Sequence, residues 1–309
     1  MVRTTICSFW LQIVRLACLI IVWPTLFTGC VRDGFTDCLL NVDLHIRLQL
    51  DSESTRLSQE IENVRVYVFD DMELLDSIIE VDVADIIEGQ PLKLKYWMSK
   101  PPTVVVWANF NGTEQFSSQA KGMSLSEMWV KMGGTVDNAL PTGALFYGIR
   151  HLNDDLVQEV VATSRVGRIS ITARGFQDLP EIAPDLFFAL STLYNGYDFN
   201  AVPLQEDVIV TSNGVISGNG YDYVTPQPIN LTLYPADYSG IVAIRVQLRR
   251  KTDTGSVLMV EAVTDENGRR ILQRAGHNTN VLLRVTEQGN VEVVIKVTEW
   301  DTIEQWAEW

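Results

Sequence analysis

The stretch Leu40-Asn-Val-Asp-Leu-His-Ile-Arg-Leu-Gln-Leu50 decides the fold class, because apolar and polar residues alternate along it without a break. A period of two places every apolar side chain on one face of the chain. This is the pattern of a β-strand that has one buried and one solvated face. The stretch therefore predicts a sheet that covers a core on one side only.

Strand-like segments return along most of the chain, separated by Gly, Asn and Pro. The run Val104-Val-Val-Trp107 is continuously apolar and predicts a central strand covered on both faces. Many short strands joined by turn signals favour antiparallel β-sandwiches. The other predicted strands lie at residues 64–68, 79–83, 92–96, 145–149, 156–162, 168–174, 186–194, 208–210, 229–233, 241–248, 257–263, 281–285 and 291–297.

One short helix interrupts this series. From Leu125 to Met132, apolar residues occupy the first, fourth, fifth and eighth positions, which lie on one face of a helix. Ser124 and Glu127 have the spacing of a capping box at its start. We expect this helix to lie across the end of a sheet, with its Met and Trp side chains in the core.

The turn-rich run Asn195-Gly-Tyr-Asp-Phe-Asn200, shortly before Pro203, is the strongest candidate for a domain boundary. It predicts two β-sandwich domains, at residues 38–202 and 203–309. A tether at residues 30–37 would precede them, and residues 1–29 would be a signal peptide.

The N-terminal segment has the layout of a secretory signal, because Arg3 and Arg15 precede the apolar run 16–27. That run is shorter than the roughly 20 residues needed to cross a bilayer. It ends in Leu26-Phe-Thr-Gly-Cys30, which resembles the box of bacterial lipoprotein signals. The resemblance implies cleavage before Cys30 and its acylation, with chains such as palmitate. The alternative is a signal cleaved elsewhere, which would leave Cys30 an ordinary thiol.

Cleavage before Cys30 would also remove Cys7 and Cys18, so lipidation of Cys30 would exclude a disulfide framework in the mature chain. The mature chain would keep 22 basic and 39 acidic residues, a net charge of −17. A field of this sign repels polyphosphates, so we expect no nucleic-acid partner.

The sequence offers no catalytic, cofactor or metal motif. None of the three histidines lies within four residues of another, and Cys30 and Cys38 do not complete a zinc set. No phosphate-binding glycine loop and no nucleophile elbow is present. We expect a protein that is not an enzyme, although a hydrolase assembled from distant residues stays an alternative.

Several stretches occur in an order that resembles a known family. They are Leu26–Cys30, Asp37–Cys38, Val64–Asp70, Pro102–Asn109, Leu145–Gly148, Ser164–Ile171, Tyr194–Phe199 and Ile295–Trp300. Together they are similar to the FimB-type fimbrial anchor family of Bacteroidetes, the lipoproteins at the base of type V fimbriae. The resemblance implies two transthyretin-like β-sandwiches of Greek-key character. It also implies a structural role in the cell outer membrane, exposed at the surface, with the anchor holding the fimbrial shaft.

The same resemblance implies that shaft subunits bind by β-strand addition, in which main-chain hydrogen bonds provide affinity. The C-terminal segment is the candidate contact, because Trp300, Ile303, Trp306 and Trp309 recur every three residues. This spacing suits a short helical turn that caps the sandwich, or a tail that rearranges on meeting a subunit.

Two other functions stay open. A glycan-binding surface lipoprotein of an uptake system would present exposed, coplanar aromatic residues; Trp97 and the terminal tryptophans are candidates, whereas Trp107 is expected in the core. A stalk or tip subunit of the same fimbrial family would share most of the strand pattern.

Overall fold

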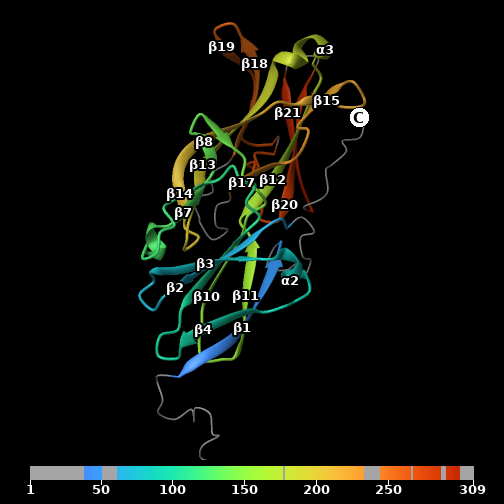
Figure 1. Ribbon diagram of the computed structural model, residues 1–309. Coiled ribbons are helices and arrows are strands. Elements are labelled where there is room, and N and C mark those ends of the chain that lie inside the picture. Colours follow the sequence, from blue (N-terminus) through green and yellow to red (C-terminus); the bar gives the residue numbers. More distant parts are fainter. Residues whose placement is uncertain are drawn as a thin grey trace, which may run out of the picture.

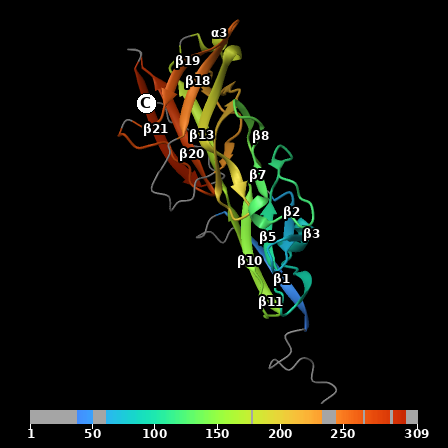
Figure 2. The same cartoon turned by 90° about the vertical axis from the view of Figure 1, so that its left-hand side faces the viewer.

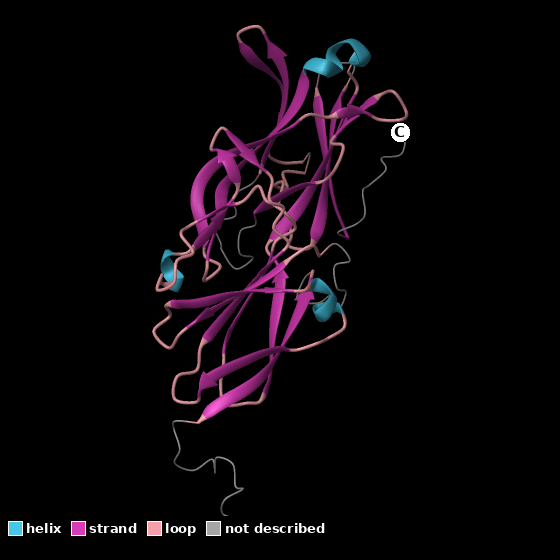
Figure 3. Cartoon of the chain, viewed as in Figure 1, coloured by secondary structure: helices cyan, strands magenta, loops and turns pink. Residues whose placement is uncertain are grey.

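The structure is a computed structural model that describes residues 38–50, 61–176, 178–232, 244–265, 267–286 and 290–299. Strands dominate these ranges and helices are few and short (Figure 3). The all-β class predicted from the alternating stretches is confirmed. Two sandwiches stack end to end along one axis, and the two views agree on this elongated shape (Figures 1 and 2).

The first sandwich comes from a single seven-stranded sheet. In spatial order its strands are β3 (Leu75–Val81), β2 (Val64–Phe69), β5 (Thr103–Ala108), β10 (Phe146–His151), β11 (Val157–Ser164), β1 (Leu39–Gln49) and β4 (Leu92–Trp97). Only two residue pairs join β10 to β11, Phe146 with Ser164 and Tyr147 with Thr163. This narrow connection lets the two halves of the sheet enclose one core.

The alternation in β1 is confirmed, because Val42, Leu44 and Leu48 are buried while Asn41 and Arg47 are exposed. All six residues of β5 are buried, as expected for a strand covered on both faces. The pairing of β1 with β11 is parallel, whereas its pairing with β4 is antiparallel. The alternation of apolar and polar residues predicts a strand, but it does not show whether that strand pairs in the parallel or the antiparallel direction.

The second sandwich packs two sheets face to face around a separate core. One has the strand order β15 (Val215–Ile216), β16 (Asp222–Val224), β12 (Val166–Arg174), β20 (His277–Val285) and β21 (Val291–Glu299), and β17 (Ile229–Thr232) also pairs with β12. The other has the order β19 (Gly255–Ala262), β18 (Arg245–Thr252), β13 (Leu186–Asp198), β14 (Pro203–Ser212), β9 (Asn138–Leu140) and β8 (Gly133–Thr135). Two further strands extend it, β7 (Trp129–Lys131), which pairs with β13, and β6 (Gln115–Phe116).

The helix predicted at 125–132 is wrong beyond its first turn. The capping box of Ser124 and Glu127 forms, but it begins only the 3-10 turn η2 (Leu125–Glu127). The chain then enters β7, because pairing with both β6 and β13 satisfies its backbone groups. Met128 and Met132 are buried, as predicted, whereas Trp129 is only partly buried.

The remaining helical turns are peripheral. They are α2 (Val83–Ile87), α3 (Leu179–Ile182) and η3 (Ala183–Asp185). The strand predicted to reach residue 83 ends at Val81, because the Asp82 carboxylate accepts a hydrogen bond from Ala84 N and begins α2. Within the described ranges, every helix is too short or too polar to cross a membrane.

The buried side chains divide near the start of β12. Most of the first cluster lies before Val166 and most of the second lies after Ile169. The exceptions are Tyr197 and Phe199, which belong to the first cluster, and Met132 and Ala139, which belong to the second. The domain boundary predicted between residues 202 and 203 falls within the hairpin that joins β13 to β14. These two strands are hydrogen-bonded neighbours in one sheet. The turn signal at 195–200 belongs to this hairpin, whose Asp198 carboxylate accepts hydrogen bonds from two backbone N–H groups of the turn.

An aromatic junction joins the two sandwiches. Strand β13 lies in the second sandwich, yet Tyr197 and Phe199 at its end are buried in the first core. The Phe199 ring lies 4.8 Å from that of Tyr67 and 6.0 Å from that of Trp107, between centroids. The Tyr147 hydroxyl donates to Phe199 O at 2.9 Å. One strand therefore anchors both cores.

Cys38 is buried and disulfide-bonded in this structure of the 309-residue chain. The expectation that excluded a disulfide applies to the mature chain, after cleavage before Cys30 and its acylation, and it stays a prediction. Its backbone O accepts a hydrogen bond from Met98 N at 2.8 Å, which extends the pairing of β1 with β4 by one residue. The remaining cysteines, Cys7, Cys18 and Cys30, lie outside the described residues.

Candidate subunit interface

Strand addition requires a sheet edge whose backbone groups are accessible. Among the described strands, eight lie at sheet edges. Four of them, β6, β8, β15 and β17, have only two to four residues and offer little backbone. Strands β3 and β4 carry charges along the edge, with Asp76 and Glu80 on one and Lys93 and Lys95 on the other. Short or charged edges are the usual protection against unwanted pairing. Strand β21 also carries charges, Glu292 and Lys296, but it is longer than β3 and β4. Strand β19 presents exposed apolar residues, so β19 and β21 are the two candidates that we compare.

Strand β21 has the more regular edge. Its nine residues pair with β20 without a register shift. At the turn, Thr286 N donates to Asn290 O at 2.8 Å, which makes these two residues a hydrogen-bonded pair. Because such pairs alternate along an antiparallel ladder, the odd-numbered residues from Val291 to Val297 direct their N–H and C=O groups away from β20. No described strand occupies that side.

The side chains of β21 separate into two faces. Val293 and Ile295 contact the second core, whereas Glu292 and Val294 face outward. Val297 belongs to the inward series but is 49% exposed. An added strand would find regular backbone groups and an apolar side chain near the end of β21.

Strand β19 is apolar but irregular. Three consecutive residues, Val257, Leu258 and Met259, are exposed. A register shift interrupts its pairing with β18 between Leu248 and Arg249. Such a bulge twists an edge strand and hinders the pairing of a further strand. We therefore regard β21 as the better site for strand addition.

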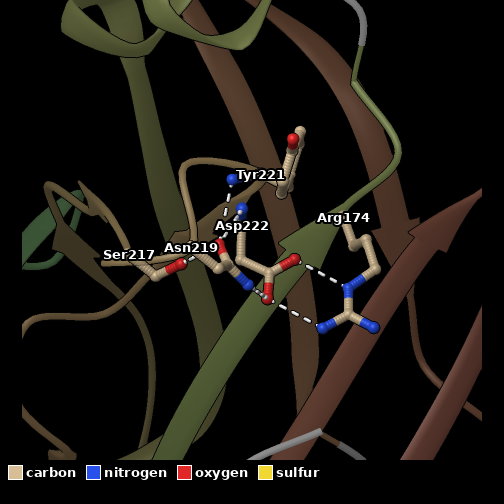
Figure 4. A network of polar contacts seen from close by, with 5 residues as sticks. All are labelled: Arg174, Ser217, Asn219, Tyr221 and Asp222. Carbon is tan, nitrogen blue, oxygen red and sulfur yellow. Dashed lines mark hydrogen bonds and ion pairs between the residues drawn. The ribbon is translucent and has the colours of Figure 1, made fainter. Parts of the chain in front are cut away.

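A polar network fixes the opposite edge of the same sheet (Figure 4). Arg174, at the end of β12, donates from Nε to Asp222 Oδ1 at 2.7 Å and from Nη2 to Asp222 Oδ2 at 2.8 Å. Asn219 Nδ2 donates to Asp222 Oδ2 at 2.9 Å, and its own Oδ1 accepts from Tyr221 N. Ser217 Oγ also donates to Asn219 Oδ1. These contacts hold the β15–β16 hairpin on the sheet.

The Asp222 carboxyl is buried, and its pKa reflects two opposing causes. Burial disfavours the charged form and would raise the pKa. Hydrogen bonds from Arg174 and Asn219, together with the Arg174 charge, outweigh burial and hold the pKa below its ordinary value. Asp222 is therefore ionised at neutral pH, and its role is structural.

The predicted site residues are not brought together by the described part of the molecule. Cys30, Trp300, Ile303, Trp306 and Trp309 all lie outside the described residues, so their roles stay predictions. Among the described residues, no group of three or more His, Cys, Asp or Glu side chains is placed to hold a metal ion.

Sequence reasoning missed two features. Three consecutive apolar residues in β19 break the alternation, and this signal could have marked an exposed edge. The Arg174–Asp222 pair joins residues 48 positions apart and has no local signal.

The fold and its open edges define a class: an elongated protein of two β-sandwiches whose candidate site is a sheet edge. The family model described as "Fimbrillin-A associated anchor proteins Mfa1 and Mfa2" matches residues 35–306. The chain belongs to this family, as its sequence resemblance implied.

Individual relatives agree with the family. The major fimbrium anchoring subunit FimB of Porphyromonas gingivalis is 22% identical over 317 residues, covering 94% of this chain and 96% of that protein. The fimbrial anchor protein Mfa2 of the same species has a similar fold, with a TM-score of 0.60 and 13% identity over 85% of this chain and 98% of Mfa2. A candidate adhesin from Bacteroides ovatus gives a TM-score of 0.62 and 15% identity over 88% of this chain and 98% of its own.

Proposed function

We propose that this protein is the anchor that attaches a fimbrial shaft to the cell outer membrane, as a lipoprotein acylated at Cys30. Its family and its relative FimB support a structural fimbrial role at the cell surface. The observation that carries the mechanism is the open edge of β21, which the chain follows with a further ten residues.

Shaft subunits join by strand addition at this edge or through the C-terminal segment. A strand placed beside β21 would form main-chain hydrogen bonds with its odd-numbered residues, and side-chain contacts would select the partner. Glu292 and Lys296, on the outward face, are charges through which a partner strand can be discriminated. The role requires no chemistry from the protein, so the proposal is a binding function without catalysis.

The architecture suits a base subunit. Cys30 lies eight positions before Cys38, where the first strand ladder begins, and β21 belongs to the second sandwich. The first sandwich therefore lies between the lipid and the proposed binding edge. The aromatic junction at Tyr197 and Phe199 connects the two cores across which a pull on the shaft would be transmitted.

One substitution and one deletion test the binding edge. Val297→Pro removes an N–H group that points away from β20, and it leaves the pairing with β20 in place because Pro is tolerated at edge positions. Val297→Thr is the matched control, since it keeps that N–H group. We expect Val297→Pro, or deletion of residues 301–309, to lower capture of purified shaft subunits about tenfold or more, equivalent to about 1.4 kcal/mol. If Val297→Pro and the deletion of residues 301–309 both capture shaft subunits as well as the intact protein does, binding at β21 and its C-terminal extension is contradicted.

A further inference from the structure

An exposed apolar pair lies at the free end of the first sandwich. Leu39, the first residue of β1, pairs directly with Trp97, the last residue of β4. The two residues are 50% and 52% exposed, and they lie on the outward face of the sheet. Trp97 contrasts with Trp107 of the same sandwich, which is completely buried. The first core does not use the Trp97 side chain, which leaves its ring available at the surface.

This pair lies where the chain enters the fold. Met98 N donates to Cys38 O, so Cys38 and the Leu39–Trp97 pair form the end of the ladder. The beginning of β1 is also the end of the molecule farthest from α3 and the β18–β19 hairpin (Figures 1 and 2). Eight residue steps separate Cys30 from Cys38 and span at most about 29 Å. A lipid on Cys30 therefore keeps this end of the sandwich close to the bilayer.

The chemistry of the end matches the interfacial zone of a membrane. Tryptophan is enriched there because its ring is apolar and its N–H group is polar. Lys93 and Lys95 project from the same outward face of β4 and can extend their ammonium groups toward lipid headgroups. Nearby loops carry Asp71, which lies 3.9 Å from Lys100, together with Asp154 and Asp155. This end of the first sandwich therefore carries charges of both signs. Burial of the Leu39 and Trp97 side chains is what favours its contact with the membrane.

We propose that the Leu39–Trp97 pair rests in the headgroup region of the membrane that holds Cys30, and so orients the anchor with its second sandwich pointing outward. The inference rests on the proposed lipidation. The lipid restrains the protein at the surface, and the effective concentration produced by the short tether makes a small contact sufficient. Because the contact is mainly apolar, it resists added salt.

The test is tryptophan fluorescence of the mature, lipidated protein in phosphatidylcholine vesicles that contain brominated acyl chains. We expect quenching by the brominated lipid that persists in high salt and is largely lost in Trp97→Phe. Trp129→Phe is the matched control, because Trp129 is a partly exposed tryptophan on β7, near the junction, and its removal should leave the quenching in place. Leu39→Glu should also reduce the quenching of Trp97, by placing a charge beside the ring.

The outcomes separate this inference from the proposed function. Protein that floats with the vesicles but shows the same quenching with and without Trp97 overturns the membrane contact and leaves lipidation intact. Protection of Trp97 from aqueous acrylamide that grows with protein density, without quenching by lipid, identifies a second copy as the occupant and also overturns it. Protein that does not float contradicts lipidation itself.

Discussion

At the scale of single residues, the Arg174–Asp222 pair is the clearest source of local stability. Two charge-assisted hydrogen bonds join a fork-shaped donor to a buried carboxylate. Removing one partner leaves the other charged and poorly solvated, which costs about 3 kcal/mol or more. The pair also closes the sheet edge opposite β21, so it limits where a further strand can add.

We predict that Asp222→Asn lowers the free energy of unfolding by about 3 kcal/mol at pH 7, measured by denaturant unfolding. Asp185→Asn is the control, because its ion pair with Arg250 is long, at 3.7 Å, and solvent-exposed; its effect should stay within about 1 kcal/mol. Equal effects of the two substitutions would contradict the structural role of Asp222.

The same pair predicts a pH dependence. The pKa of Asp222 is lower in the folded than in the unfolded protein. The stabilisation that ionised Asp222 contributes is therefore complete above its unfolded-state pKa of about 3.9. This stabilisation is lost as the pH falls through the lower folded-state pKa. The stability difference between the wild type and Asp222→Asn should shrink below about pH 4. A difference that stays constant down to about pH 2 would exclude this cause.

Single residues also show what could be predicted. The alternation around Val42 and Leu44 predicted the inward face of β1, because burial selects side chains locally. Neither the Arg174–Asp222 pair nor the contact of Leu39 with Trp97 could be predicted, because both depend on which strands become neighbours.

At the scale of elements, the packing of β7 against β13 shows why the helix prediction failed. The apolar spacing at 125–132 fits a helix, and the capping box forms as predicted. The outcome was decided by Gly196 of β13, which lets the backbone of β7 approach so closely that an added Cβ would lie 2.1 Å from Val130 O. Tertiary pairing therefore overrode the local helical signal.

Gly196→Ala tests this close approach. The methyl group would contact backbone atoms of Val130 and Lys131, so β7 must move away from β13. We predict a loss of about 2 kcal/mol in the free energy of unfolding, typical of overpacking a close contact. Gly218→Ala is the control, since no heavy atom lies within 4 Å of the position that its added Cβ would take, and it should change stability by less than about 0.5 kcal/mol.

At the scale of the whole molecule, the elongated arrangement follows from how the chain crosses between sandwiches. The chain passes from β11 into β12, and β13 returns Tyr197 and Phe199 to the first core. The turn signal at 195–200 suggested a boundary there, but it marks a hairpin within one sheet. The number and class of the sandwiches could be predicted from strand patterns, whereas the division of their cores depends on contacts distant in sequence.

The proposed anchor role has a direction along the long axis of the molecule. The chain enters at the end that bears Leu39, and β21 offers its open edge in the second sandwich. In the proposed function, the first end would lie at the membrane and β21 would bind a shaft subunit. Lipid at Cys30 and strand addition at β21 are thus separable requirements, and the binding variants at Val297 should leave membrane attachment unchanged.

The substitution Cys30→Ala tests whether Cys30 holds the fimbrium to the cell. The measurement is the distribution of the anchor and of shaft subunits between washed membranes and the culture medium, for cells that carry Cys30→Ala or the unchanged chain. We predict that the variant anchor leaves the membrane fraction and that assembled fimbriae appear in the medium. Variant anchor and fimbriae that both stay with the membranes would contradict it.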